Sequence, residues 1–311
     1  MNAGAPPVIA IVGATATGKS HVAIGIAEAL SGEIVNADSM QFYRGMDIGT
    51  AKLAPSERRG IPHHQIDTLD VHEDASVARY QAEARADVDA IHARGARAIA
   101  AGGSGLYVRA LLDAFEFPAT DPEVRAALEA RAEKEGPGIL HRELAAVDPE
   151  AARAIDPRNA KRIVRALEVI EMTGRPFSSG LPGREYALPA LQIGLRCERE
   201  SLDARIDARA AAMWDGGLLA ETESLAARGL REGVTARRAV GYAEALAVLD
   251  GAMSEDDARE ATARHTRRLA RKQGTWFGAD ERIAWIAAPR DADDLARAVS
   301  DALDLVARLE S

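Results

Sequence analysis

The chain has 311 residues, of which 47% are hydrophobic and 28% charged, and its formal net charge is −9. This composition is typical of a globular protein with a sizeable core, and the length accommodates one large α/β domain or one domain that carries an insertion. The single cysteine, Cys197, excludes an internal disulfide. Residues 1–7 lack the basic and apolar regions of a leader, and no stretch is long enough to span a bilayer. We therefore expect a cytoplasmic protein with no membrane partner.

A glycine-bounded loop follows the first predicted strand, which begins at Val8. The pattern G-x-x-x-x-G-K-[ST] is matched by Gly13, Gly18, Lys19 and Ser20. The glycines let successive N–H groups turn inward, and the helix that follows adds its positive end, so we predict a phosphate site. Lys19 can reach terminal phosphate oxygens and Ser20 can hold Mg²⁺. The predicted loop consists of Gly13, Ala14, Thr15, Ala16, Thr17, Gly18, Lys19 and Ser20.

The second predicted strand, Glu33 to Val35, leads into a polar segment from Asn36 to Lys52. Open α/β sheets bind ligands at the carboxyl ends of their strands, which makes Asp38 and Ser39 candidates for a site. The Asp38 carboxylate can act as a general base or as an indirect Mg²⁺ ligand. Alternatively, it closes a local turn by accepting a backbone hydrogen bond.

A short strand is predicted within Ile61 to Asp67, where two histidines are adjacent. Neighbours in a strand face opposite sides, so we do not expect them to share a metal. Next, Ser76 caps a predicted helix that ends at Gly95. The strand Arg97 to Ala101 then leads into a glycine-rich turn, Gly102 to Tyr107, which contains Ser104. Small residues there allow a ligand to approach the backbone closely.

The composition changes after about residue 115, where Asp121-Pro122 begins a helix and no convincing strand follows until Leu191 to Leu195. The simplest interpretation is an all-helical insertion between strands of a sheet. We place this insertion at residues 116–189, between the two parts of the core at 1–115 and 190–311.

Two segments carry clustered positive charge despite the acidic balance of the chain. One helical face of the insertion is predicted to carry Arg158, Lys161, Arg162 and Arg165. This face contacts phosphates or is a solvated surface, since Glu168 and Glu171 follow. The second segment, Ala263 to Ala279, ends in Trp276 and Phe277. Cations beside aromatic rings suit a splayed single-stranded nucleic acid, although either ring could be a core residue.

Eight motifs in order along the chain resemble those of one family, the tRNA dimethylallyltransferases: GATATGKS, NADSMQFYRGMDIGTAK, PHHQID, GGSGLY, KRIVRALEV, TGRP, AVGYAE and ARKQGTWF. The resemblance implies a P-loop-type α/β core, a parallel sheet flanked by helices, with the all-helical insertion closing over the RNA. It implies transfer of a dimethylallyl group from dimethylallyl diphosphate to N6 of the adenosine 3′-adjacent to the anticodon, with release of diphosphate. Donor and adenine would enter a channel from opposite sides of a monomer that uses Mg²⁺.

The resemblance also assigns roles to residues. Thr15 to Ser20 match the diphosphate-binding loop and Asp38 matches the catalytic base. Ser104, the second predicted catalytic residue, stands where the family usually has threonine. We expect Gln41 and Ser104 to surround the flipped adenine. The predicted tRNA-binding residues are Asp38, Ser39, Met40, Gln41, Ser104, Lys161, Arg162, Ile163, Val164, Arg165, Arg238, Gly241, Tyr242, Arg271, Lys272, Gln273, Thr275 and Trp276.

The chain departs from the family at Ala14, Asn36 and Gly278, and the last of these puts one phosphate contact in doubt. Three other functions stay open at this point. An adenylate prenyltransferase shares the first half of the pattern, a small-molecule kinase shares the phosphate loop, and a non-catalytic RNA-binding protein shares the basic segments. The basic segments argue against the first of these.

Overall fold

The computed structural model describes residues 6–114, 117–118, 120–178 and 183–311. The chain divides into two compact units. The sheet unit comprises Met1–Asp113 and Tyr186–Ser311, and the helical unit comprises Ala114–Glu185. Of the predicted boundaries, the one between 115 and 116 lies outside the described residues. None of the helices in the described ranges is long and apolar enough to cross a membrane.

The sheet unit is built on six parallel strands in the order β3-β2-β4-β1-β5-β6. The strands are β1 (Val8–Gly13), β2 (Gly32–Asn36), β3 (His63–His64), β4 (Arg97–Gly102), β5 (Ala190–Arg196) and β6 (Ile283–Ala287). Every residue of β1 is buried, as its unbroken apolar sequence requires for a strand covered on both faces. The predicted α/β class with a parallel sheet is confirmed.

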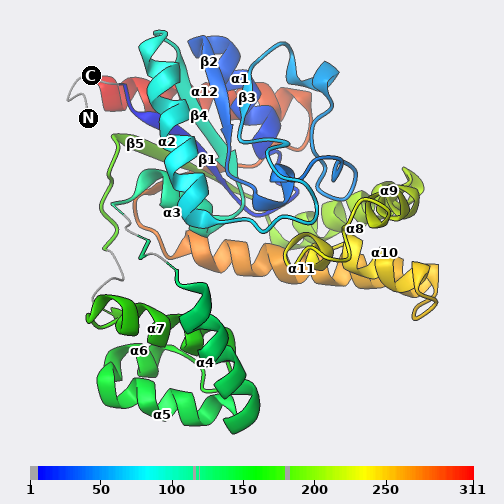
Figure 1. The fold of residues 1–311 in the computed structure, drawn as a ribbon. Helices are drawn as coiled ribbons and strands as arrows, with labels where there is room; N and C mark the ends of the chain where they lie inside the picture. Colours follow the sequence, from blue (N-terminus) through cyan, green and yellow to red (C-terminus); the bar gives the residue numbers. More distant parts are fainter. Residues whose placement is uncertain (1–5, 115–116, 119, 179–182) are drawn as a thin grey trace. The chain divides into compact units, whose positions relative to one another are not determined.

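The helices of the sheet unit are α1 (Lys19–Leu30), α2 (Val77–Ala93), α3 (Gly105–Leu112), α8 (Arg199–Asp215), α9 (Leu218–Ala226), α10 (Tyr242–Leu249), α11 (Glu255–Gly278) and α12 (Ala292–Glu310). In this unit, α1 and α12 cover one face of the sheet and α2 and α3 the other, while α8 to α11 lie at the end of the strands (Figure 1). On the first face, α1 and α12 share a core with the strands, formed by residues such as Ile11, Ile26 and Ala302. Along α2, the predicted cap Ser76 accepts a hydrogen bond from the Arg79 N–H. The turn predicted at Gly102 to Tyr107 is shorter than expected, because α3 already begins at Gly105.

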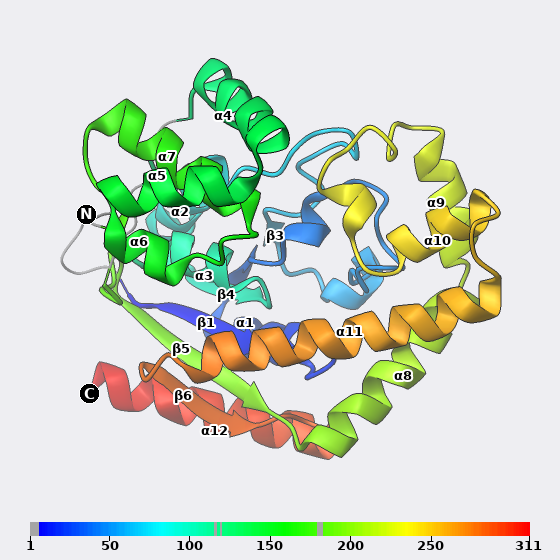
Figure 2. The ribbon, with the colours of Figure 1, turned by 90° about the horizontal axis from the view of Figure 1, so that it is seen from below.

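Short 3₁₀ helices punctuate the loops at Ser39–Phe42 (η1), Pro55–Arg58 (η2) and Ala236–Arg238 (η4). Figure 2 shows α11 lying along α8. At its carboxyl-terminal end, α11 reaches the loops that follow β1 and β4, because Gln273 bonds to both of them. These contacts place α8 and α11 at the carboxyl ends of the strands, where an open α/β sheet binds its ligands.

The helical unit consists of α4 (Pro122–Glu135), α5 (Pro137–Val147), α6 (Pro149–Ala154) and α7 (Ala160–Thr173). Proline stands in the first turn of the first three helices, where its missing N–H costs nothing. Side chains of Asp121, Asp148 and Asn159 cap α4, α6 and α7. The unit has its own apolar core, which includes Leu140, Leu144 and Ile163.

Candidate active site

The phosphate loop curls between β1 and α1 as its glycines require. Gly13 has φ +133° and Gly18 has φ +85°, in the region that favours glycine. A Cβ on Gly13 would also meet the Leu195 carbonyl oxygen at 3.0 Å. Within the loop, the buried Thr17 hydroxyl donates to the Ala14 carbonyl at 2.9 Å. The first residues of α1, Lys19 and Ser20, line the cavity beside the loop, and the N–H groups of a first helical turn have no partner within the helix.

Lys19 is held across this loop, where its Nζ donates to the Ala14 carbonyl at 2.6 Å. Burial lowers the pKa of Lys19 from 10.5 to about 8, against an opposing effect of the Asp38 carboxylate and with a smaller contribution from the Arg209 cation. The ammonium is thus still charged at neutral pH, and a bound anion would stabilise that charge.

Two cavities meet beside the loop, both within the sheet unit. The first, the phosphate pocket, has a volume of about 570 Å³ and is lined by loop residues such as Gly18, Lys19 and Ser20, and by Arg205 of α8. The second, the apolar pocket, has a volume of about 500 Å³. Its walls come from η1, the start of α3, η4 and the facing sides of α8 and α11, including Tyr107, Ile206, Ala210, Met213, Leu269 and Trp276.

Four residues line both pockets: Thr15, Asp38, Thr50 and Arg209. Asp38 follows β2, and its Oδ1 accepts a hydrogen bond from the Met40 N–H at 3.1 Å, which caps η1. The local turn weighed as an alternative is therefore present. It leaves the carboxylate facing both cavities, because it uses only one lone pair of one oxygen. The acid thus lies between the phosphate loop and the apolar pocket.

Arg209 and Thr50 line both pockets and are site residues that the sequence analysis missed. Arg209 carries the charge. It lies half-buried on α8, and burial lowers the pKa of its guanidinium while the Asp38 carboxylate opposes this effect. Its Nη2 lies 3.5 Å from the Thr50 carbonyl oxygen, at the limit of a hydrogen bond. The available signal was its position in the helical row that begins at Leu202 and Ile206, since a cation in an otherwise apolar row needs an anionic partner.

Ser104 and Ser39 meet across the loops that follow β4 and β2. The Ser104 Oγ accepts from the Ser39 N–H at 3.2 Å and lies 3.2 Å from the Ser39 Oγ. The two loops can approach because Gly102 has no side chain, since a Cβ there would lie 2.2 Å from the Ala37 carbonyl oxygen. Both serines line the apolar pocket, as does Met40.

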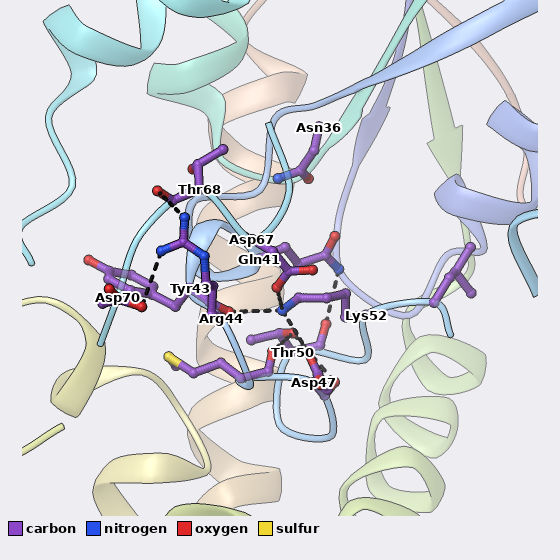
Figure 3. A network of polar contacts seen from close by, with 12 residues as sticks. Asn36, Gln41, Tyr43, Arg44, Asp47, Thr50, Lys52, Asp67, Thr68 and Asp70 are labelled. Carbon is purple, nitrogen blue, oxygen red and sulfur yellow. Dashed lines mark hydrogen bonds and ion pairs between the residues drawn. The ribbon is translucent and has the colours of Figure 1, made fainter. Parts of the chain in front are cut away.

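Gln41 belongs to the phosphate side. Its Nε2 donates to the Thr50 carbonyl at 3.2 Å. Among the described residues, Gln41 lines the phosphate pocket and does not line the apolar pocket. The contact of Gln41 with the flipped adenine stays a prediction. Figure 3 shows Gln41 within a network centred on the buried Lys52, whose Nζ donates to the Tyr43 carbonyl and pairs with Asp47 and Asp67. The network fixes the loop that carries Thr50.

Gln273 is engaged inside the protein. Its Oε1 accepts from the Thr15 N–H at 2.8 Å, and its Nε2 donates to the Gly103 carbonyl at 3.0 Å. The side-chain amide therefore joins the phosphate loop to the loop after β4, and its contact with tRNA stays a prediction. Its helical neighbours Arg271, Lys272 and Thr275 are exposed. The aromatic pair divides, with Trp276 46% exposed at the pocket and Phe277 buried in the core.

The segment from Arg238 to Tyr242, also predicted to bind tRNA, contains both buried and exposed residues. Tyr242 is fully buried, and its hydroxyl donates to Glu221 at 2.5 Å and accepts from the Gly49 N–H at 3.2 Å. Gly241 precedes it as the cap of α10, with φ +93°. Arg238, in contrast, is exposed and lines the apolar pocket.

In the helical unit, Ile163 and Val164 are buried in the core, so their side chains are not available to a tRNA. Lys161 and Arg162 are exposed on α7. Arg165 pairs with the fully buried Glu168. Arg158 precedes α7 and pairs with Asp156, so the predicted face does not extend to it.

The comparisons with known proteins agree on one family. The IPP transferase family matches residues 41–280. A tRNA dimethylallyltransferase of Kineococcus radiotolerans is 57% identical over 305 residues, which are 96% of this chain and 96% of the relative. The solved tRNA isopentenylpyrophosphate transferase of Bacillus halodurans is 37% identical, with a TM-score of 0.70 and coverage of 98% and 99%. A eukaryotic dimethylallyltransferase solved acting on tRNA is 26% identical, with a TM-score of 0.84 and coverage of 97% and 80%.

Proposed function

Because the chain belongs to the IPP transferase family, we propose that it transfers the dimethylallyl group of dimethylallyl diphosphate to the N6 amine of the adenosine 3′-adjacent to the anticodon of tRNAs, releasing diphosphate. The observation that carries this function is the pair of pockets joined at Asp38, Thr15, Thr50 and Arg209. One pocket suits an anion and the other an apolar and aromatic group, and an acid stands between them.

The diphosphate of the donor fits the phosphate pocket. Inward N–H groups of the loop, Lys19 and Arg209 surround the position where negative charge accumulates as diphosphate departs. Such groups are held in place by the fold before reaction, and for this reason they stabilise a leaving anion more effectively than water does. The prenyl tail then extends past Thr15 and Thr50 into the apolar pocket.

The adenine amine is a poor nucleophile, because its lone pair is delocalised into the ring. In the proposed step, N6 forms a bond to C1 of the prenyl group, the C1–O bond to diphosphate breaks, and a proton of N6 passes to the Asp38 carboxylate. The adenine must leave the anticodon stack to arrive there, at a cost of a few kcal/mol that contacts in the apolar pocket offset. Ser39 and Ser104 lie beside Asp38 to contact the base.

Mg²⁺ is part of the proposal. The Ser20 hydroxyl and the Asp38 carboxylate both line the phosphate pocket. Hard oxygen donors that share a pocket with a substrate phosphate are what Mg²⁺ prefers, so these residues fit it. Bound there, the ion would neutralise charge on the diphosphate.

The exposed polar and aromatic residues of the predicted tRNA-binding set are assigned to the tRNA. We assign tRNA contact to Lys161 and Arg162 of the helical unit, and to Arg238, Arg271, Lys272, Thr275 and Trp276 of the sheet unit. We propose that the protein acts on tRNA in the cytoplasm as a monomer, since both pockets lie within one chain.

The test is incubation of the chain with labelled dimethylallyl diphosphate and bulk unmodified tRNA, followed by nucleoside mass analysis. We expect N6-dimethylallyladenosine and one equivalent of diphosphate. Parallel reactions with AMP, and with ATP in place of the donor, distinguish the alternatives. Prenylated AMP with no modified tRNA, or acceptor-dependent release of ADP, would overturn the proposal.

A further inference from the structure

A row of side chains runs along the exposed face of α11 and ends at the apolar pocket. Arg264, Arg268, Lys272 and Trp276 recur at every fourth position, a spacing that places them on one side of a helix. All of them are exposed. Lys272 and Trp276 line the apolar pocket, so the row leads from solvent to the place where the adenine would enter. Arg271 lies beside the row on the same exposed surface.

The cations of this row differ from the other arginines of α11. Arg259 pairs with Asp215 and Glu255, and Arg267 pairs with Asp207. In the described parts of the chain, no carboxylate lies within ion-pair distance of the row or of Arg271. The chain has 48 acidic and 39 basic residues, so acidic partners are not scarce. A cluster of unpaired cations on such a surface favours an anionic partner from solution.

The row also has a defined end. The two preceding positions of the same every-fourth-residue series are Glu260 and Asp256, both exposed, so the sign of the charge reverses just before Arg264. From Arg264 to Trp276 the helix advances about 18 Å, and consecutive cations of the row are about 6 Å apart. That interval suits neighbouring phosphates of one RNA strand. A strand that passed beyond Arg264 would meet repulsion.

We propose that Arg264, Arg268, Arg271 and Lys272 form a phosphate track that holds one strand of the anticodon stem-loop and fixes the register that delivers a single adenine to Asp38. The inference rests on the proposed function and deepens it. Phosphate contacts position a nucleic acid without reading its sequence, so the track selects by distance from the pocket. At the pocket end, the exposed Trp276 ring offers a stacking surface for a base next to the flipped adenine.

The test measures RNA binding without donor, over a range of salt concentrations. The variants are Arg264→Ala and Arg268→Ala, with Arg308→Ala as control, an exposed arginine at the carboxyl-terminal end of α12. We expect each track variant to weaken binding of a full anticodon stem-loop several-fold. Each should reduce the slope of log K against log salt by about 0.7–0.9, the value for one lost phosphate contact. The control should leave both quantities unchanged, and thermal melting checks that all three variants fold.

A second arm uses a hairpin whose stem is shortened so that it no longer reaches Arg264. The effect of Arg264→Ala should disappear on this RNA, whereas Lys272→Ala should weaken both RNAs. The track would be overturned if Arg264→Ala bound RNA with the same affinity and salt slope as Arg308→Ala, or if it weakened the binding of both RNAs equally. Since no donor is present, this outcome is separate from the product assay. Lack of prenylated adenosine would overturn the function and leave the salt slopes as measured.

Discussion

The two pockets of the site share four residues and are built in opposite ways. The anion-binding part of the phosphate pocket is one contiguous segment, the loop between β1 and α1, with backbone N–H groups and Lys19, and α8 adds the cations Arg205 and Arg209. The apolar pocket is assembled from η1, α3, η4, α8 and α11, which are far apart in sequence. A site for an anion can be encoded in one motif, because N–H groups of one loop converge without help. A site for an apolar group requires walls from many elements.

Asp38 is the residue that gives the junction of the pockets its chemistry, and its replacement should have the largest effect. We expect Asp38→Asn to reduce the rate of prenyl transfer by about 10³-fold, within the range that general-base catalysis contributes, while tRNA affinity changes by less than about tenfold. The amide keeps the acceptor oxygen for the Met40 N–H, so η1 stays capped. Single-turnover rates at saturating substrates give the measurement.

The matched control for that variant is Asp70→Asn, which removes an equal charge from a half-exposed ion pair with Arg44. Its rate should stay at the wild-type value. A normal single-turnover rate in Asp38→Asn would remove the carboxylate from the base role and leave the junction without a proton acceptor.

Lys19 should make the binding of the donor's diphosphate depend on pH, whereas binding in the apolar pocket should not depend on the charge of Lys19. Its pKa is lowered by burial to about 8, so the ammonium is charged below that pH and neutral above it. Affinity for inorganic diphosphate should therefore fall as the pH rises through 8, by up to tenfold per unit at the limit. The comparison is with Lys19→Met, which carries no charge at any pH. At pH 7 this variant should bind about 10²-fold more weakly.

The informative quantity is the ratio of the two diphosphate affinities, because titration of the ligand itself cancels in it. The ratio should shrink between pH 8 and pH 10. A ratio that stays constant over this interval would contradict the assignment of Lys19 to the anion.

The sequence could predict the contiguous half of the site and could not predict the assembled half. The glycine spacing from Gly13 to Gly18 fixes the loop locally, and the strand before it fixes where the loop lies. The guanidinium of Arg209 interacts with the Asp38 carboxylate only because α8 packs beside the loop after β2. A single sequence does not show how a helix packs, so this interaction could not be predicted. For the same reason, the sequence could not show that the Gln273 amide joins two loops within the protein.

The helix caps at Ser76 and Asp121 could be predicted from the sequence, because each side chain bonds to N–H groups within three residues of itself. Burial of Tyr242 and Val164 was not predictable from their motifs, because a resemblance names positions without saying which side chains face inward.

Gln273 of α11 connects the phosphate loop to a helix that lines the apolar pocket, so its replacement should affect the phosphate pocket. Gln273→Ala leaves the Thr15 N–H and the Gly103 carbonyl without their side-chain partner. We expect the KM for dimethylallyl diphosphate to rise about tenfold, since each lost hydrogen bond costs on the order of 1 kcal/mol. The salt slope of tRNA binding should not change. The exposed Thr275→Ala serves as control for the donor KM, and a reduced salt slope in Gln273→Ala would instead place this side chain on the RNA.

Tyr242→Phe should have the smallest effect, and it tests whether a buried residue next to the apolar pocket acts on stability and not on tRNA binding. The change removes a hydroxyl that donates to Glu221 and accepts from the Gly49 N–H, next to Thr50 at the junction. Glu221 keeps its hydrogen bonds from the backbone N–H groups of Asp47 and Ile48. We therefore expect a loss of about 1–2 kcal/mol in the free energy of unfolding, measured by urea denaturation, and tRNA affinity within twofold of wild type. Unchanged stability with weakened tRNA binding would mean that the ring leaves its buried position when RNA binds.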